Sequence, residues 1–577
     1  MCSPLLAVVS SCLFAQTLAI LYPFQLKTTL NGSYEVVINW ALDYKANIAS
    51  FKLEIAAKTA SHARWLAVGF SDRGQYEGSD LCLYRNEQIL DTHIADNGLI
   101  TPDIQQDCDN ANSVQMPDGR VLVEFERAFD TCDPDDYVLE EGTTQFVVAL
   151  GFSSRLNIHS VHVVKEIVPY RLFRSVQPPL SLPSDVSTMV LSTHNVLIPQ
   201  KETNYWCELV RMPVLPTKHH IVKYEALIQP GSEPFVHHME VFHCEKPSDQ
   251  GHYVPHFSGP CDSTNAPSLL KSCKHVIGAW AMGAEPLEYP AQAGIPVGGY
   301  DYFPFALVEI HYNNPGLKSV TGVIDSSGIR FYYTGQLRPY DSGILEVGLI
   351  YSDTMAIPPN MEEFPLTGYC TPKCTDVSLP DNGITIFASQ LHAHLTGRRL
   401  KTVLVREGVE VAEVNRDDHY SPHWQEIRPL HKQIRVLPGD SLVTTCVHNT
   451  ENRDKVTLGG YGIHDEMCVN YLHYYPKSEL EVCKSAVDNS TLKQYFRFLR
   501  DEGRMPRKAG TTADNYRSIS WDKQQVEQLA GLYGAAPLTV HCLRSFGESF
   551  AGDWNKQSLT SIRSSLVEEK VKCVEAR

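Results

Sequence analysis

The sequence predicts an all-β protein built from several sandwich-like domains. Short strand-like segments, such as 120–125 and 307–312, recur along the chain and are separated by clusters of glycine, proline, asparagine and aspartate. Long stretches with helical spacing are largely absent before the C-terminal region. Repeated short strands joined by turns favour β-sandwiches or barrels. A chain of 577 residues has room for about three or four such domains.

The N-terminus has the composition of a secretory leader. Residues 1–22 carry no charge, residues 5–21 are almost wholly apolar or small, and Lys27 is the first charged residue. Small residues at 17–19 offer a cleavage site for a signal peptide. An uncleaved signal anchor, which would associate the protein with a membrane, is the alternative, because roughly 18 apolar residues approach the length of a membrane span.

Changes in composition divide the rest of the chain. A proline-rich segment at 177–183 has the character of a linker. The two regions after this linker are similar in size, and each contains a histidine-rich strand. Residues 522–533 have spacing compatible with a helix. The predicted regions are 23–175, 185–335, 336–500 and 501–577.

Charge and composition exclude some classes of function. The net charge is -17, from 50 basic and 67 acidic residues, and no long run of lysine or arginine occurs. Nucleic acid is therefore disfavoured as a partner. Hydrophobic residues make up 43% of the chain and charged residues 20%, which is ordinary for a globular protein and excludes disorder as the dominant state.

The cysteines indicate disulfides. The chain has 16 cysteines, two of them in the leader, which leaves an even set of 14. The closest pair is Cys370 and Cys374, and the short CxxC spacing of structural zinc sites is absent. A scattered, even set behind a leader favours disulfides. Glycosylation sequons at Asn31 and Asn489 agree with a secretory route.

One strand-like segment carries histidines at alternate positions. Gln390, His392 and His394 would share one face of a strand, with apolar residues on the other. Two imidazoles at this spacing can bind one metal ion. A polar strand face with two solvated histidines is the alternative. The apolar segment at 384–388 favours the metal interpretation.

Three further segments carry candidate ligands with weaker individual signals. His237 and His238 are adjacent, so both can reach one metal ion only at a β-bulge or a strand end; otherwise one is a core or surface residue. His311 shares a strand face with Glu309, and the simpler interpretation is a half-buried strand on which the histidine has its hydrogen-bond partners within the protein. Met467 would more often be a core residue than a ligand, although a disulfide at the neighbouring Cys468 would hold its sulfur in place.

Several longer runs resemble the dopamine β-hydroxylase family, which includes tyramine β-hydroxylase and is related to peptidylglycine α-hydroxylating monooxygenase. The resemblance extends from about residue 30 to about residue 570. The segment at 65–80 (WLAVGFSDRGQYEGSD) is similar to the DOMON domain that precedes the catalytic core in the amine hydroxylases. The other runs are 236–244 (VHHMEVFHC), 255–261 (PHFSGPC), 388–398 (ASQLHAHLTGR) and 466–476 (EMCVNYLHYYP).

The resemblance implies a fold and two copper sites. A DOMON sandwich would precede two antiparallel, jelly-roll-like copper domains and a small C-terminal region. Tyr205 and His392 match family positions with active-site roles, and for Tyr205 a structural aromatic beside a disulfide is the alternative. The implied ligands are His237, His238 and His311 for an electron-transfer copper, and His392, His394 and Met467 for the copper that activates O2.

The ligand types suit the implied chemistry. Imidazole binds copper in both oxidation states, and the soft thioether of methionine favours Cu(I). Ascorbate would deliver the electrons, one oxygen atom of O2 would enter the substrate and the other would become water. The metal performs the difficult chemistry, while the protein fixes its geometry and excludes side reactions.

The resemblance also implies disulfide pairings. Vertebrate relatives have additional cysteines, thought to join subunits, after the strand that corresponds to 484–499, and residues 500–510 contain none. A disulfide-linked oligomer is therefore in doubt, whereas a noncovalent homodimer remains open. The implied pairs are Cys207–Cys261, Cys244–Cys273, Cys370–Cys483, Cys374–Cys542, Cys446–Cys468 and Cys132–Cys573, with Cys82 and Cys108 left to pair within the first domain.

Three hypotheses follow. The first is a secretory-pathway amine β-hydroxylase, in a vesicle or outside the cell, with Glu309 as a candidate partner for the amine of dopamine or tyramine. The second is a related copper monooxygenase with a more apolar substrate. The third is a non-catalytic copper-binding or DOMON adhesion protein, against which the intact Met467 argues. In the first domain Asp80 and Asp103 are candidate ligands for a metal, but a structural role is the simpler expectation.

Overall fold

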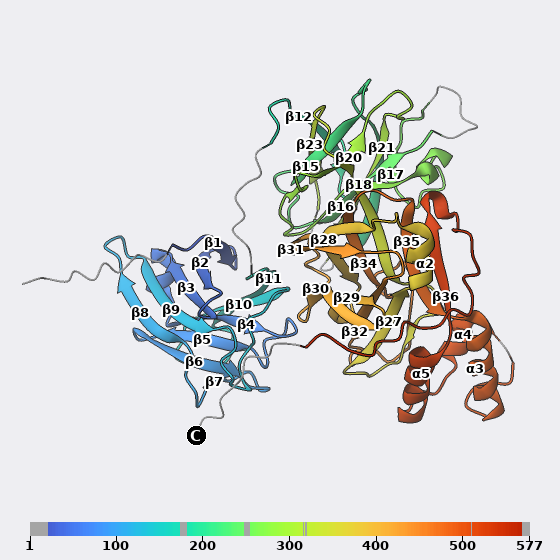
Figure 1. Ribbon diagram of the computed structural model, residues 1–577. Coiled ribbons are helices and arrows are strands. Elements are labelled where there is room, and N and C mark those ends of the chain that lie inside the picture. Colours follow the sequence, from blue (N-terminus) through green and yellow to red (C-terminus); the bar gives the residue numbers. More distant parts are fainter. Residues whose placement is uncertain are drawn as a thin grey trace, which may run out of the picture. The chain divides into compact units, whose positions relative to one another are not determined.

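The computed structural model describes residues 21–173, 182–246, 254–314, 317, 320–508 and 510–567, and it consists mainly of β-strands (Figure 1). This confirms the predicted all-β class. Nearly all of the predicted leader and most of the predicted linker at 177–183 lie outside the described residues, as does Cys573. In the described part of the chain, no helix has the length and apolar character needed to span a membrane.

The chain forms two compact units, and the first comprises residues 1–140 and 146–168. Alternate residues of its strands are buried, because one face of each sheet packs against the other sheet. Between the sheets, the rings of Trp40 and Phe146 lie 5.6 Å apart. The first sheet has the order β1 (Phe24–Leu30), β2 (Tyr34–Asp43), β3 (Ile48–Ile55), β9 (Val121–Ala128) and β8 (Asp109–Gln115). The second has the order β11 (Val163–Tyr170), β10 (Thr144–Gly151), β4 (Trp65–Ser71), β5 (Asp80–Arg85), β6 (Gln88–Ile94) and β7 (Ile100–Pro102). A short helix, α1 (Ala57–His62), precedes β4.

The second unit comprises residues 141–145 and 169–577 and contains two further sandwiches. We call the one built from residues 187–341 the first copper sandwich. One of its sheets has the order β12 (Ser187–Ser192), β23 (Gly328–Thr334), β15 (His219–Leu227), β20 (Ala293–Val297) and β24 (Tyr340–Asp341), with β19 (Leu287–Glu288) paired to β15. The other has the order β17 (Ser258–Pro260), β14 (Thr203–Arg211), β21 (Phe305–Asn313), β16 (Val236–Cys244) and β18 (Cys273–Ala281), and β13 (Val196–Leu197) pairs β22 (Ile324–Asp325) separately.

The remaining sandwich is built from residues 343–544, and we call it the second copper sandwich. One of its sheets has the order β31 (Arg428–Val436), β28 (Ile384–Ala393), β34 (Cys468–Tyr475), β25 (Gly343–Leu349), β35 (Leu480–Val487) and β36 (Leu538–Arg544). The other has the order β27 (Phe364–Cys370), β32 (Ser441–His448), β29 (Gly397–Arg406) and β30 (Val409–Asp417); β26 (Ala356–Ile357) pairs β33 (Thr457–Leu458). Because β36 pairs with β35, the predicted C-terminal region 501–577 contributes a strand to this sandwich.

The helices lie mainly near the C-terminus. They are α2 (Pro372–Ser378), α3 (Asn489–Asp501), α4 (Thr512–Arg517) and α5 (Lys523–Ala535). The predicted helical segment at 522–533 is confirmed by α5. The expected strand at 484–499 is wrong beyond Val487, because Asp488 caps α3 by accepting hydrogen bonds from the backbone of Ser490 and Thr491. The buried face of α3 repeats at helical spacing, with Leu492, Tyr495, Phe496 and Leu499.

The two copper sandwiches share buried contacts. Phe387 and Ala388 of β28 belong to the hydrophobic core of the first copper sandwich. At another point of contact, His275 of β18 lies between two carboxylates: its Nε2 is 2.8 Å from Glu245 and its Nδ1 is 3.0 Å from Glu481, which belongs to β35. Since a doubly hydrogen-bonded imidazole between two carboxylates is a cation, these contacts link the sandwiches electrostatically, and they raise the pKa of His275.

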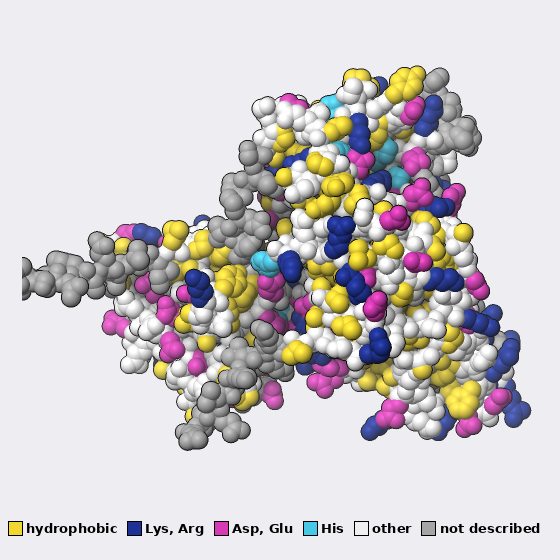
Figure 2. Space-filling view, viewed as in Figure 1, with side chains coloured by type: hydrophobic (Ala, Val, Ile, Leu, Met, Phe, Trp, Pro, Cys, Tyr) yellow, Lys and Arg dark blue, Asp and Glu magenta, His cyan; other side chains and the backbone are white. Residues whose placement is uncertain are grey.

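The disulfides reinforce this architecture. Most of the cysteines in these disulfides are buried. On the face of the molecule shown in Figure 2, acidic and basic side chains are interspersed. The expected pairing of Cys82 with Cys108 is confirmed, and so are five of the six pairs that the resemblance implied; Cys132–Cys573 stays a prediction because Cys573 lies outside the described residues. The confirmed five are Cys207–Cys261, Cys244–Cys273, Cys370–Cys483, Cys374–Cys542 and Cys446–Cys468.

Candidate metal centres

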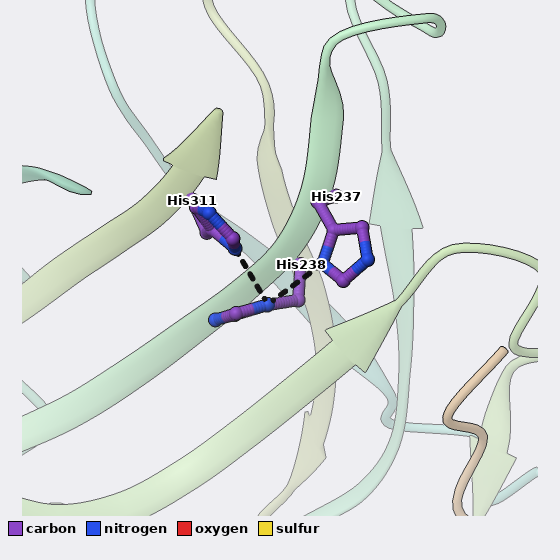
Figure 3. A group of neighbouring side chains, drawn as sticks. All are labelled: His237, His238 and His311. Carbon is purple, nitrogen blue, oxygen red and sulfur yellow. Dashed lines mark hydrogen bonds between the residues drawn. The ribbon is translucent and has the colours of Figure 1, made fainter. Parts of the chain in front are cut away.

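Three histidines converge in the first copper sandwich. His238 of β16 lies directly opposite His311 of the neighbouring β21, and the register shifts between Val236 and His238. This is the β-bulge that two adjacent histidines require, and it brings His237 to the same place (Figure 3). The Nδ1 atom of His238 is 3.1 Å from Nδ1 of His237 and 3.3 Å from Nδ1 of His311.

The outer nitrogens of this cluster have protein partners. Nε2 of His311 lies 2.7 Å from the hydroxyl of Thr203, and the backbone of Pro422 interacts with His237. Burial lowers the pKa of His237 to about 4 and that of His311 to about 3. The rings are therefore neutral near pH 7, with their Nδ1 lone pairs facing one another, which is the arrangement that a metal ion needs.

The second histidine set lies at the end of β28. His392 is the penultimate residue of this strand and His394 follows it, and their ring centroids are 5.2 Å apart at an angle of 90°. Nδ1 of His392 lies 2.5 Å from Oε1 of Gln425, and Nδ1 of His394 lies 3.1 Å from the carbonyl of Asp465. Because both partners are acceptors, each Nδ1 carries the proton and each Nε2 is left with a lone pair for a metal.

The two sets lie close enough to influence each other. Burial is the main cause of the strongly lowered pKa of His238, and the neighbouring histidines, including His392 and His394 from the other sandwich, contribute to it. Burial also lowers the pKa of His392 to about 4, and His237 contributes to this shift. The histidines of the two copper sandwiches therefore lie near one another.

Glu466 links the residues of the second set. Its carboxylate is fully buried and accepts hydrogen bonds from the backbone amides of His394 at 2.5 Å and Met467 at 2.9 Å. The backbone amide and the hydroxyl of Thr396 donate to its other oxygen, at 2.9 Å and 2.5 Å. The next residue after Met467, Cys468, forms the disulfide that begins β34. The side chain of Glu466 thus fixes the backbone at His394 and at Met467.

Tyr205 lies beside the first histidine set. Its ring stacks on that of His311, with centroids 4.4 Å apart and an angle of 5° between the planes. The side chain is 37% exposed, so one face of the ring remains accessible. Burial, together with Glu309 and Glu240, raises the pKa of Tyr205 to about 12. The phenol therefore stays protonated at neutral pH.

A pair of carboxylates continues the strand face of the first histidine set. Glu240 lies directly opposite Glu309, two residues beyond the opposed His238 and His311. Burial and the neighbouring Glu309 raise the pKa of Glu240 to about 8, and burial raises the pKa of Glu309. Like charges at directly opposed positions destabilise a sheet. Within the described residues, neither carboxylate forms an ion pair with a basic side chain.

Comparison with known proteins identifies the domains. Residues 189–319 and 340–496 match the models of the N-terminal and C-terminal domains of copper type II ascorbate-dependent monooxygenases, and residues 32–151 match the DOMON domain. Dopamine beta-hydroxylase from Bos taurus is 43% identical over 96% of this chain and 90% of its own length. Tyramine beta-hydroxylase from Caenorhabditis briggsae is 43% identical, covering 89% of this chain and 87% of that protein.

The chain belongs to the copper type II ascorbate-dependent monooxygenase family. A more distant relative, DBH-like monooxygenase protein 1 from Gallus gallus, is 30% identical over 92% of this chain and 87% of that protein. Copper, ascorbate and O2 are therefore the cofactor and co-substrates of this monooxygenase. The donors found here fit copper, because converging neutral imidazoles are ligands that copper accepts, and Glu466 holds the backbone of Met467 close to that of His394.

Several residues important for the monooxygenase sites were missed in the sequence. Glu240 could have been found, because alternation places it on the same strand face as His238. Thr203, Gln425 and Glu466 gave no such signal, since their contacts join segments far apart in the chain. The two aspartates considered in the DOMON domain are both paired, Asp80 with Arg127 and Asp103 with His93, which fits the structural role expected for them.

Proposed function

We propose that this monooxygenase hydroxylates the β-carbon of a phenylethylamine, converting dopamine to noradrenaline or tyramine to octopamine. The names of the relatives that match nearly the whole chain support this substrate class. The opposed carboxylates Glu240 and Glu309 carry the argument from this chain itself. Because the pKa of Glu240 is raised to about 8, this carboxyl is mostly protonated at neutral pH when no cation is bound. The ammonium group of the substrate would stabilise the charged form of the pair.

The proposed copper ligands are the two sets described above. His237, His238 and His311 would hold the electron-transfer copper, and His392, His394 and Met467 would hold the copper that meets O2. Bound copper supplies electron transfer and activation of O2. Burial lowers the pKa of His237, His238, His311 and His392. Contacts with Thr203, Pro422, Gln425 and the carbonyl of Asp465 orient the rings.

The carboxylates near the site differ in their availability to a substrate. Glu346 of β25 is 2.8 Å from the ammonium group of the buried Lys484, so its charge is already balanced. Glu240 and Glu309 have no such partner among the described residues. In the proposed complex the amine therefore contacts Glu240 of β16 and Glu309 of β21, on the face of the sheet that carries the histidines. The aromatic ring extends from there toward the second copper sandwich. Tyr205 would contribute an aromatic wall beside His311.

A cavity lies near the proposed site. It has a volume of about 410 Å³ and is lined by residues of both copper sandwiches, among them Tyr302, Glu346 and Tyr471. The ring of Tyr471 lies 6.2 Å from that of His392. This volume is within the range of pockets that bind small molecules, and it accommodates a phenylethylamine.

Turnover of dopamine and tyramine with ascorbate, measured side by side on copper-loaded protein, tests the proposal. Failure to convert either amine while two copper ions bind would favour a non-catalytic copper-binding protein. Conversion of a neutral ring analogue in preference to both amines would favour the alternative of a more apolar substrate. The ratio of kcat/KM values for the two amines identifies the preferred one.

Variants test the amine site separately. Glu309→Gln and Glu240→Gln should each raise KM for the amine by roughly 10-fold or more, because a hydrogen bond to a charged group contributes about 1.5–3 kcal/mol. The KM of a neutral analogue should change little. Glu225→Gln, on the opposite sheet, is the control, since its partners Arg330 and Tyr332 can still donate to an amide oxygen. An unchanged KM in Glu309→Gln would remove this residue from the amine site.

We also propose a location in the secretory pathway, inside a vesicle or outside the cell. The six disulfides of the described residues need an oxidising compartment to form. Expression with and without reductant, followed by counting free thiols in the secreted protein, tests this. A noncovalent homodimer remains a prediction that sedimentation of the purified protein would test.

A further inference from the structure

A short segment of the second copper sandwich reaches both histidine sets. It comprises residues 421–425, Ser-Pro-His-Trp-Gln, within the connection from β30 to β31. The base of this connection is fixed by the buried Arg428, whose guanidinium lies 2.7 Å from Asp417 and 3.2 Å from Glu426. A segment held at its base in this way presents its tip in a defined position.

The segment contacts the second histidine set through Gln425. Its Oε1 accepts a hydrogen bond from Nδ1 of His392 at 2.5 Å, and its backbone carbonyl accepts one from the side chain of Gln390 at 2.9 Å. The amide nitrogen of the same glutamine donates to the carbonyl of Pro422 at 2.6 Å. Both ends of the Gln425 side chain are thus occupied, one by a proposed copper ligand and the other by the tip of the segment.

The segment contacts the first histidine set through Pro422 and His423. The backbone of Pro422 interacts with His237, and the rings of His423 and His237 lie 6.2 Å apart. Hydrogen bonds therefore run from Pro422 through Gln425 to His392, while Pro422 and His423 lie beside His237 of the other copper sandwich.

A close fit between Trp424 and Gly283 holds the segment against the first copper sandwich. Trp424 is buried, and a Cβ atom added to Gly283 would lie 1.7 Å from its indole ring. Gly283 follows β18 in a turn whose preceding residue, Met282, donates its backbone amide to the carbonyl of His237 at 2.9 Å. The indole ring of Trp424 therefore packs against the same turn whose backbone is hydrogen-bonded to His237.

We propose that residues 421–425 form a latch that joins the two histidine sets across the sandwiches, with Gln425 as the positioning residue that connects them. The latch rests on the copper ligands assigned under the proposed function. Its role is to hold the two copper centres at a fixed separation, which a reaction that needs electrons from one centre at the other requires. Because Trp424 packs on Gly283 of the first copper sandwich and Gln425 bonds to His392 of the second, movement of either sandwich disturbs the segment as a whole.

Gly283→Ala tests the seat of the latch. The added Cβ has no room beside Trp424, so the latch must move, although neither histidine set is altered. The matched control is Gly299→Ala, because Gly299 also has a positive φ of 114° but a Cβ there meets no atom within 4 Å. In copper-loaded protein we expect amide hydrogen exchange at 421–425 to rise at least about 10-fold in Gly283→Ala relative to the control.

Gln425→Glu and Gln425→Ala separate the latch from simple orientation of His392. Glutamate retains an oxygen that accepts from His392 but loses the donor to Pro422. If Gln425 only orients His392, Gln425→Glu should match the wild type. The latch predicts that Gln425→Glu keeps two copper ions per chain, yet shows the faster exchange and a turnover reduced roughly 10–100-fold. Gln425→Ala should in addition bind the second copper more weakly.

The proposal fails if exchange at 421–425 in both Gly283→Ala and Gln425→Glu equals that of Gly299→Ala. Should Gly283→Ala not fold, Gln425→Glu carries the test alone. Hydrogen exchange does not depend on the substrate, so a failure of the amine proposal would show as absent turnover in the wild type and would leave this readout intact.

Discussion

Replacing Glu466 with glutamine should strongly weaken both the fold around the second histidine set and its hold on copper. The carboxylate accepts four hydrogen bonds in a fully buried position, two of them from the backbone of His394 and Met467. Glutamine has the same shape, but one of its two terminal atoms is a donor. At least one buried backbone amide then faces another donor instead of an acceptor.

The size of the effect follows from these contacts. A hydrogen bond to a charged group contributes about 1.5–3 kcal/mol, and a buried donor left without a partner costs about 1–3 kcal/mol. Together they give a loss of about 2.5–6 kcal/mol in the free energy of unfolding. This is a large fraction of the roughly 5–15 kcal/mol that stabilises a typical domain. Residues that orient metal ligands typically change metal affinity by about 10–100-fold when they are replaced.

Urea unfolding and copper retention during dialysis against a chelator measure the two effects. Asp465→Asn is the matched control, because it removes an exposed carboxylate one position away while its backbone carbonyl still accepts from His394. We expect Glu466→Gln to lose one of its two coppers at a chelator concentration at which the control keeps both. Equal unfolding energies and equal copper content in the two variants would refute the role assigned to Glu466.

Two further predictions concern other parts of the second unit. Replacing Cys446 and Cys468 with serine opens a loop with a sequence separation of 22, so the free energy of unfolding should fall by about 3 kcal/mol in the loop-entropy model. Urea titration under non-reducing conditions measures this loss, and an unchanged unfolding midpoint would contradict the prediction. His275 has a raised pKa through Glu481 and Glu245, so its contribution to stability is complete below pH about 6.5 and is lost as the pH rises through its folded-state pKa. Unfolding of His275→Gln should therefore lack a pH-dependent component that the wild type shows as the pH rises from about 6.5 through the folded-state pKa of His275, and identical pH profiles would show that the contact contributes nothing.

Much of the fold was predictable because it depends on local spacing. The alternation in 307–312 predicted a strand with Glu309 and His311 on one face, and the residues of the other face, Val308, Ile310 and Tyr312, are all buried in one core. The adjacent histidines 237 and 238 could reach one metal ion only at a β-bulge or a strand end, because neighbouring side chains on a regular strand point to opposite faces. The structure has the bulge. The spacing of α3 was equally local but was overlooked.

The candidate ligands were predictable only in part. Two imidazoles in alternate positions already indicate a metal site at the end of β28, whereas most of the disulfide pairings and the role of Met467 came from resemblance to known enzymes. The sequence by itself determined which faces of the strands are apolar and which carry the ligand groups, because these properties repeat every second residue.

Only the tertiary structure decided which of these groups meet. Strand register places Glu240 opposite Glu309, and close packing seats Trp424 on Gly283. Glu466 and Gln425 acquire their partners from segments more than 30 residues away. Such contacts depend on how complete strands pair and how sheets pack, and no local pattern of residues records that choice.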